Sequence, residues 1–314
     1  MFLLKNNKLS NNQIIDNKSP KNNSRKIQAF SLIELSIVIL IIGILVAGVT
    51  SSSRLIKKMK LITAQNLTNS SPIHSIKNLA LWLESSQDNS FNNNEASNNT
   101  EITIWYDSNI QSTYKVNAFS PSTASNPKFV DDSINNLPAI RFDGSNDYLR
   151  IDSAGIYGSQ LTYFVVTKRI TMINAATTFS GLGQGYSYDA DNSASLIGFY
   201  EFSGTQLAPY RANAVLSINN VHPGNGVPYI ASAVFNGTTN IAYLNGVANN
   251  IVNSAGNFAI STIYIGTRVY NSGPSPGYYN GDIAELIFFT RALNSEERIS
   301  IEQYLGKKYG IKVS

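Results

Sequence analysis

Paired carboxylates are the residues that carry out glycoside hydrolysis in most glycosidases, and in retaining enzymes two of them about 5 Å apart act as nucleophile and acid. The chain has no E-x-D-x-x-E run or comparable pair on one predicted strand. Glu285 stands alone in its strand, and helix capping explains Glu296 and Glu297. The two histidines, His74 and His222, lie far apart and are expected on the surface or in loops, which leaves little for a triad or a zinc site. We therefore expect a protein that is not an enzyme.

The oxygen-rich stretch D-G-S-N-D, residues 143–147, carries the residue types that bind calcium. Asp143, Asn146 and Asp147 supply hard oxygen ligands within one loop. The alternative, which the sequence favours, is that these residues simply form a hairpin turn. Two further acid pairs could supplement the ligand set: Asp131 with Asp132, and Asp189 with Asp191.

Aromatic side chains gather near predicted loops and strand ends in Y-S-Y-D, G-F-Y-E-F and G-Y-Y-N. Exposed rings of this kind could form the platform of a saccharide site, and core positions are the competing interpretation because the chain holds 17 tyrosines. The candidate ligand-binding residues are Tyr186, Tyr188, Phe199, Tyr200, Tyr278 and Tyr279.

One more carboxylate, Glu34, lies inside an apolar run. Leu35–Val49 is uncharged and largely aliphatic, and with Phe30–Ile33 and the small residues after it the stretch reaches the roughly 20 residues that span a bilayer as a helix. A cleaved secretory signal is the alternative, because Lys21 and Lys26 precede the run, although the run is long for such a signal. An ionised acid in a membrane costs a few kcal/mol, so Glu34 needs a partner.

Charge is distributed unevenly along the 314 residues. Residues 1–60 hold ten Lys or Arg and two acids, whereas residues 61–314 hold 14 basic and 18 acidic residues. The mildly acidic remainder has no basic stripe, so we expect no binding to nucleic acid. The chain has no cysteine, which excludes disulfides and thiolate chemistry.

The polar and basic leader, a small residue, F-S-L-I-E-L and an aliphatic helix together resemble the type IV prepilins, a class that includes the pseudopilins of type II secretion. The resemblance implies that prepilin peptidase cuts between Ala29 and Phe30 and that Phe30 is then N-methylated. Residues 1–29 would be a disordered leader that is cleaved, and residues 30–70 the transmembrane and assembly helix. Ala29 departs from the usual glycine, which predicts slower or partial processing.

The same resemblance offers Glu34 a partner. In an assembled filament Glu34 would pair with the new α-amino group of Phe30 on a neighbouring subunit and thereby set the axial register. The alternative is that Glu34 bonds only to the backbone amides of its own first helical turn.

Beyond a predicted linker at residues 71–77, the pattern changes to short strands with period-two apolarity and turns between them. The stretch I-A-Y-L-N-G-V-A predicts a hairpin with a type I′ turn at Asn245-Gly246. Asn294 and Glu297 predict the start of a C-terminal helix that ends before Gly310 and docks on the sheets.

Several stretches resemble the laminin-G-like, concanavalin A-like jelly rolls, in the order that this family shows: A-L-W-L-E, I-T-I-W-Y-D, L-P-A-I-R-F-D-G-S-N-D-Y-L, Y-L-N-G-V and G-D-I-A-E-L-I-F-F-T-R-A-L-N-S-E-E-R. The resemblance implies that residues 78–314 form an all-β antiparallel jelly-roll sandwich closed by a C-terminal helix. It does not imply one ligand, because the family includes carbohydrate binders, calcium-dependent adhesion modules and structural domains.

Taken together, these observations predict a type IV pilin-like subunit of the minor-pilin or adhesin type, single-pass in the inner membrane, with its C-terminal domain periplasmic or on a surface filament. The expected partners are prepilin peptidase, other pilin or pseudopilin subunits, inner-membrane lipid, and surface glycans or cell-surface proteins. A type II secretion pseudopilin is the alternative, followed by a membrane-anchored carbohydrase. Calcium is the one cofactor that the sequence suggests.

Overall fold

The computed structural model describes residues 31–172, 180–186, 197–202, 206–211, 214–215, 222–253, 256–270, 273–275 and 277–314. The chain divides into two units, Met1–Ser52 and Ser53–Ser314, which we describe separately. Helix α1 (Leu32–Asn69) contributes to both.

In the first unit, α1 carries the apolar run. Its aliphatic side chains are exposed, with Leu40 and Leu45 at 63% and 62% of their full accessible surface. Among the described residues, the helix that begins at Leu32 is the one long and apolar enough to cross a membrane. The predicted apolar helix is therefore confirmed, and an exposed aliphatic surface of this kind favours an apolar environment.

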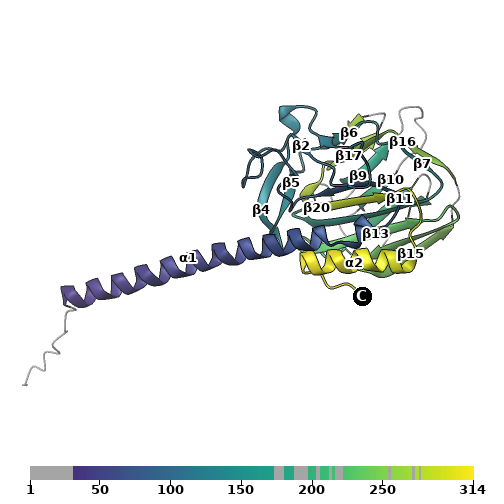
Figure 1. The fold of residues 1–314 in the computed structure, drawn as a ribbon. Coiled ribbons are helices and arrows are strands. Elements are labelled where there is room, and N and C mark those ends of the chain that lie inside the picture. The colour runs from purple at the N-terminus through teal and green to yellow at the C-terminus, as the bar shows by residue number, and fades with distance from the viewer. Residues whose placement is uncertain are drawn as a thin grey trace, which may run out of the picture. The chain divides into compact units, whose positions relative to one another are not determined.

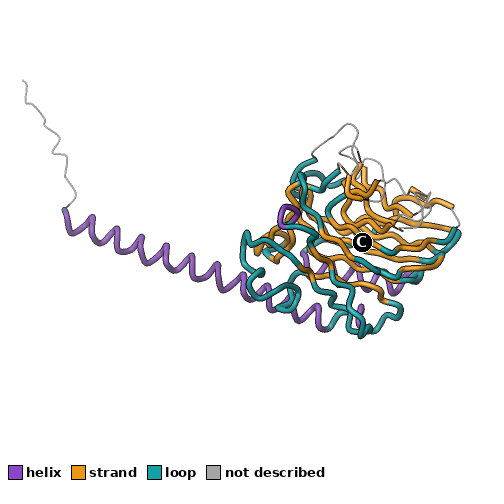
Figure 2. The backbone as a smooth tube through the Cα atoms, turned by 90° about the horizontal axis from the view of Figure 1, so that it is seen from above, coloured by secondary structure: helices purple, strands orange, loops and turns teal. Residues whose placement is uncertain are grey.

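The second unit is an antiparallel sandwich of two large sheets (Figures 1 and 2). In the first sheet β20 is central: it pairs with β8 on one side, and with β5 and then β1 on the other. The strands of this sheet are, in spatial order, β15 (Val247–Asn253), β14 (Thr239–Leu244), β13 (Pro228–Phe235), β8 (Leu161–Arg169), β20 (Asn280–Phe289), β5 (Leu137–Asp143) and β4 (Lys128–Ile134), with β1 (Leu79–Glu84) beside β20.

The second sheet is built from shorter strands. In spatial order they are β12 (Ala214–Val215), β11 (Gln206–Arg211), β10 (Ile197–Phe202), β9 (Ser180–Tyr186), β17 (Thr262–Ile265), β6 (Leu149–Ile151), β3 (Ala118–Phe119) and β2 (Ile104–Trp105). Two small ribbons accompany it, β7 (Ile156–Gly158) with β16 (Phe258–Ile260) and β18 (Arg268–Tyr270) with β19 (Gly273–Ser275). A short 3-10 helix, η2 (Thr123–Ser125), precedes β4.

The first sheet is buried on both faces. On β8, Tyr163 and Val165 pack into the core between the two sheets, while Phe164 and Val166 face a second core on the other side. Because successive side chains of a strand point to opposite faces, a strand covered on both sides reads as a continuous apolar run, as L-T-Y-F-V-V does.

Helix α2 (Ser295–Tyr309) covers the outer face of the first sheet. Asn294 accepts from the Glu297 backbone N–H and Glu297 accepts from the Asn294 N–H, which completes the predicted capping box. Gly310 ends the helix with a φ of 64°. Figure 1 shows α2 alongside the strands, and its residues Ile301 and Leu305 are fully buried in the second core. Docking of this helix is thus confirmed.

The end of α1 packs on the same outer face. Ala64 belongs to the second core, and Thr68 is 3% exposed. The segment predicted as a linker, residues 71–77, is instead packed: it holds the 3-10 helix η1 (Pro72–His74), and Ile73 is fully buried. Apolar Ile73 and Ile76 are the residues that place this segment in the core.

Two tight turns organise the first sheet. Asn245 and Gly246, with φ values of 49° and 84°, join β14 to β15 as the predicted hairpin. Asn135 and Asn136, with φ values of 55° and 60°, join β4 to β5 in the same way. Both turns use residue types that tolerate the left-handed region.

Candidate functional site

The N-terminus of α1 is capped by its own side chains. Ser31 Oγ accepts from the Ile33 N–H at 3.3 Å, and Glu34 Oε2 accepts from the Ser31 N–H at 2.8 Å. Within a single chain, Glu34 therefore does what the second interpretation expected, since it satisfies a free amide of the first turn. A second function of Glu34 toward Phe30 of another copy is compatible with this arrangement, because a carboxylate accepts several hydrogen bonds.

The predicted leader and both residues of the cleavage pair, Ala29 and Phe30, lie outside the described residues. The described chain begins at Ser31, directly after that pair.

The stretch 143–147 forms a turn that its own carboxylates stabilise. Asp143 Oδ1 accepts from the Ser145 N–H at 2.7 Å, and Asp147 Oδ2 accepts from the Asp143 N–H at 2.9 Å. The stretch is thus a turn, but it is not the hairpin turn that the sequence suggested, because it joins β5 of the first sheet to β6 (Leu149–Ile151) of the second. Within the described residues, no group of three His, Cys, Asp or Glu side chains is placed to hold a metal ion.

The turn nevertheless borders a cavity of about 420 Å³ at the ends of β5 and β20. The side-chain amides of Asn126 and Asn280 donate to Glu101 and to the Asp143 carbonyl at 2.9 and 3.1 Å. Within the described chain, the side-chain carbonyl oxygens of Asn126 and Asn280 accept no hydrogen bond. The second carboxylate oxygens of Asp143 and Asp147 accept none either. The cavity is therefore rich in unused acceptor oxygens, which suit a cation or a hydroxyl-rich ligand.

Asp147 has an unusual protonation equilibrium. It is 7% exposed, and burial followed by repulsion from Asp143 raises its pKa to about 6. A cation bound beside these carboxylates would relieve both effects.

Of the two supplementary acid pairs, only Asp131 and Asp132 lie within the described residues. Asp131 and Asp132 pair with Lys57 on α1, at 3.2 and 3.4 Å. Asp189 and Asp191 lie outside the described residues. Because Asp131 and Asp132 pair with Lys57, their carboxylates do not supplement the ligands of the turn.

The structure corrects the proposed aromatic platform at two positions. Phe199 and Tyr279 are fully buried, Phe199 in edge contact with Tyr163 and Tyr279 hydrogen-bonded to Thr167 Oγ1 at 2.7 Å. Phe199 on β10 and Tyr279, which directly precedes β20, both belong to the core between the sheets. Of the other platform residues, only Tyr278 can be placed by its side chain: its partly exposed ring lies 6.4 Å from that of Tyr148.

Tyr188 lies outside the described residues, and Tyr186 and Tyr200 are placed by their backbone alone, on β9 and β10. Whether these three rings bind a ligand stays a prediction.

A buried ionic cluster joins α2 to the first sheet and to the end of α1. Lys308 Nζ donates to Glu84 Oε2 at 2.7 Å, to Glu285 Oε2 at 2.9 Å and to Thr68 Oγ1 at 2.8 Å. Trp82 Nε1 donates to the other Glu285 oxygen at 2.7 Å. From the sequence Glu285 looks isolated, because Lys308 and Trp82 lie more than 20 residues away along the chain.

The protonation states of this cluster follow from its charges. Burial alone would lower the pKa of Lys308, but attraction to Glu285 and Glu84 raises it well above its ordinary value. Burial would raise the pKa of Glu84, and Lys308 reverses this, whereas burial and the Glu84 charge raise the pKa of Glu285. The cluster therefore tends to hold one protonated lysine and one ionised carboxylate, a balance of charge that suits a structural cluster in the low-dielectric interior.

A second cluster surrounds Glu201 on β10. His222 Nε2 lies 2.9 Å and Tyr229 Oη 2.5 Å from Glu201 Oε1, and Arg169 Nη1 lies 3.3 Å from Glu201 Oε2. His222 lies in a loop, one of the two expected positions, and its ring is fully buried. Every oxygen of Glu201 has a donor, which indicates a structural network.

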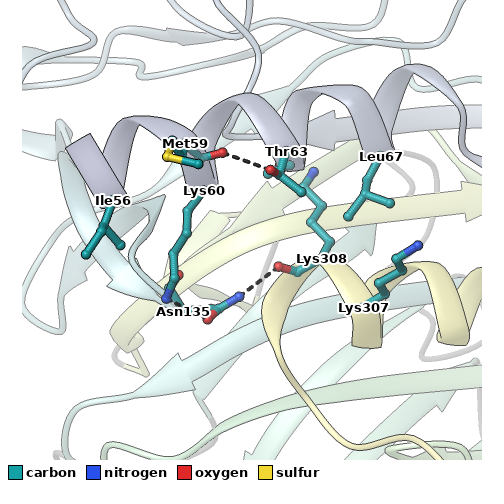
Figure 3. A pocket seen from close by; sticks show the side chains of 9 residues that line it. Ile56, Met59, Lys60, Thr63, Leu67, Asn135, Lys307 and Lys308 are labelled. Carbon is teal, nitrogen blue, oxygen red and sulfur yellow. Dashed lines mark hydrogen bonds between the residues drawn. The ribbon is translucent and has the colours of Figure 1, made fainter. Parts of the chain in front are cut away.

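The last turns of α1 border a groove of about 340 Å³ (Figure 3). Figure 3 shows Ile56, Met59 and Leu67 along the helix, with Lys60 reaching toward Asn135. Lys60 Nζ lies 2.6 Å from Asn136 Oδ1 and 3.2 Å from Asn135 Oδ1. The β4–β5 turn is thereby fastened to α1, and the apolar side chains beside it stay accessible.

Comparison with known families gives one sequence match. Residues 24–50 match the prokaryotic N-terminal methylation motif, the type IV prepilin motif. This segment contains Ala29, Phe30 and Glu34. No curated protein sequence matches the chain.

Solved structures similar to this chain are β-sandwich proteins at low identity. Domain 4 of an extracellular arabinanase from Geobacillus stearothermophilus, in complex with arabinotriose, is 17% identical over 72% of this chain and 97% of its own, with a TM-score of 0.48. A Trypanosoma rangeli sialidase is 16% identical over 82% of this chain and 39% of its own, with a TM-score of 0.49. The binding domain of Paraclostridial Mosquitocidal Protein 1 is 14% identical over 72% of this chain and 52% of its own, with a TM-score of 0.49.

Proposed function

We propose that this chain is a type IV pilin-like subunit of the minor-pilin or adhesin type, which prepilin peptidase processes and which assembles through its N-terminal helix. The observation that carries the proposal is the methylation motif at residues 24–50, whose Glu34 lies in the first turn of a long apolar helix. The helix would hold the subunit in the inner membrane as a single span, and the sandwich would lie in the periplasm or on a filament. A sandwich of this size on every subunit would crowd a thin fibre, which favours a minor subunit.

The decisive experiment is mass spectrometry of the mature N-terminal peptide from native membranes and from sheared surface material. The proposal expects N-methylated Phe30 at the terminus, with an Ala29→Gly variant raising the processed fraction. An intact leader in both fractions, in cells that process another prepilin, would overturn it.

A type II secretion pseudopilin is the second candidate, supported by the same motif. The two differ in location. Processed chain in the sheared surface fraction supports the filament subunit, whereas processed chain confined to the cell envelope supports the pseudopilin.

We further propose that the sandwich binds and does not catalyse. Two arrangements support this: the carboxylates of Glu84 and Glu285 are engaged by a buried lysine, and Glu201 by three donors. Release of reducing ends from any of a set of plant, algal and bacterial polysaccharides by the purified chain would contradict the proposal.

For the ligand of the cavity beside Asp147, we propose Ca²⁺, with Asp143, Asn146 and Asp147 as the protein ligands. The unused acceptor oxygens and the raised pKa of Asp147 support it. Isothermal titration with CaCl₂, with MgCl₂ as the comparison, tests the proposal; Asp147→Asn should weaken calcium binding at least tenfold. Absence of heat and of any thermal shift would exclude the site. Surface glycans and cell-surface proteins remain the proposed targets of the sandwich as a whole.

A further inference from the structure

A crevice of about 300 Å³ lies within the second unit, between α1 and β4. Its apolar lining comes from Leu61, Phe129 and Pro138, and its charged lining is Arg54, Lys58 and the ion pair of Lys57 with Asp131, which leaves Arg54 and Lys58 in excess. The crevice therefore combines an apolar surface with two positive charges. Ligands that carry both an anionic group and an apolar part match such a site.

The positive charges of Arg54 and Lys58 are not balanced by an ion pair within the described chain. Arg54 and Lys58 are four residues apart on α1, so they share one face of the helix, and both are exposed. No carboxylate of the described chain lies within ion-pair distance of either, whereas neighbouring Lys57 pairs with Asp131 and Asp132. Like charges at this spacing destabilise a helix slightly, and a bound anion would remove that cost.

The position of this pair in the chain limits its distance from the apolar run. The run ends at Val49, five residues before Arg54 and nine before Lys58. A chain extends by at most about 3.6 Å per residue, so the Cα of Arg54 lies within about 18 Å of that of Val49 in any conformation. If the run spans a bilayer, Arg54 thus lies at or near the headgroup layer.

We propose that the crevice formed by Arg54, Lys58 and Leu61 of α1 with Phe129 and Pro138 of the sandwich binds the headgroup of an anionic phospholipid. This inference rests on the proposed membrane insertion of α1. The guanidinium of Arg54 binds a phosphate oxygen pair, and the ammonium of Lys58 adds a second charge to the same phosphate. Leu61, Phe129 and Pro138 contact the glycerol and the first methylene groups. The lipid holds the sandwich to the membrane surface before assembly, and extraction into a filament releases it.

The test uses the full chain in nanodiscs of phosphatidylcholine alone or with phosphatidylglycerol. The two tryptophans, Trp82 and Trp105, are both fully buried in the sandwich, so their fluorescence reports its unfolding alone. Phosphatidylglycerol should raise the sandwich Tm by about 2–4 °C at low salt, the size expected when a ligand binds only the folded state. The rise should disappear in about 1 M salt.

An Arg54→Gln/Lys58→Gln variant should lose this rise while keeping at least the wild-type Tm in phosphatidylcholine discs, which shows that it folds. A Lys307→Gln/Lys312→Gln variant makes the same charge change at two exposed lysines and should keep the rise.

Three outcomes would overturn the proposal: an equal rise in the Arg54/Lys58 variant, an equal rise in phosphatidylcholine discs with added inorganic phosphate, or a rise only in discs that hold two copies, which would assign the crevice to a second chain. Retention of the chain in membranes after an alkaline wash tests insertion separately. An inserted chain whose Tm does not depend on the lipid would contradict this inference and leave the proposed membrane insertion intact.

Discussion

The ammonium of Lys308, on the last turn of α2, lies 2.9 Å from the carboxylate of Glu285 in the middle of β20, and neither side chain is exposed. The contact joins elements that lie apart in the sequence: α2, the central strand of the first sheet and, through Thr68, the end of α1. The segment of α1 within the sandwich unit is thus fixed by a charge cluster as well as by apolar packing.

Removing this ammonium should be costly. Lys308→Met leaves Glu84 and Glu285 buried without their cation, and breaking a buried ion pair in this way costs about 3–5 kcal/mol. Denaturant unfolding followed by tryptophan fluorescence measures the loss. The exposed neighbour provides the control, since Lys307→Met should change the free energy of unfolding by less than about 0.5 kcal/mol. Equal effects of the two variants would refute the structural role of the cluster.

The Asn245-Gly246 turn should be intolerant of a side chain for two separable reasons. At Gly246, φ is 84° and a Cβ would lie 2.7 Å from the Ser314 carbonyl oxygen and from Val313 Cγ1. At Gly226, φ is 77° but a Cβ would meet nothing within 4 Å. Gly226→Ala should therefore cost only the backbone strain of about 1–2 kcal/mol, and Gly246→Ala should cost at least about 1 kcal/mol more because of overpacking. Chemical denaturation of both variants checks the difference; equal losses would show that the C-terminus moves aside freely.

Asp147 should give the stability of the sandwich a distinct pH dependence. Its pKa of about 6 lies above the ordinary value of 3.8, so the folded state holds this proton more tightly than the unfolded state. The stabilisation is complete below about pH 4 and is lost as the pH rises through about 6. Because other acids, such as Asp282, have lowered pKa values and act in the opposite direction, the prediction concerns the difference between wild type and Asp147→Asn. Unfolding free energies measured without calcium should show the wild type losing stability relative to the variant between pH 4 and 7. A constant difference would indicate that Asp147 titrates normally.

Glu34 should affect assembly more than insertion. Glu34→Ala removes the hydrogen bond to the Ser31 N–H, and loss of such a cap costs a helix about 0.5–2 kcal/mol, which the apolar run can absorb in a membrane. Membrane retention should therefore stay at the wild-type level. If Glu34 pairs with the Phe30 amine of a neighbouring subunit, as predicted from the sequence, incorporation into sheared filaments should fall strongly. Glu34→Gln keeps an oxygen that can accept the Ser31 N–H but removes the negative charge, so its incorporation into filaments should fall as it does in Glu34→Ala. Normal incorporation of Glu34→Gln would leave the cap as the only function of this side chain.

Much of the local structure follows from residues that lie close together in the sequence. The period-two apolar pattern predicted a strand-rich sandwich because side chains two apart share a face, and Asn294 with Glu297 predicted the start of α2 because both halves of a capping box lie within one turn. The apolar run around Glu34 and the turn at Asn245-Gly246 were readable for the same reason.

The sequence by itself determined the apolar helix with its prepilin motif, the β-sandwich class and the turn at residues 143–147, since each depends on short-range pattern and backbone preference. Only the tertiary structure decided which polar and aromatic groups are buried together. It placed Phe199 and Tyr279 in the core, His222 against Glu201, and Lys308 between Glu84 and Glu285. These partners are separated by 21 residues or more, and their pairing depends on which strands become neighbours, information that no local pattern contains.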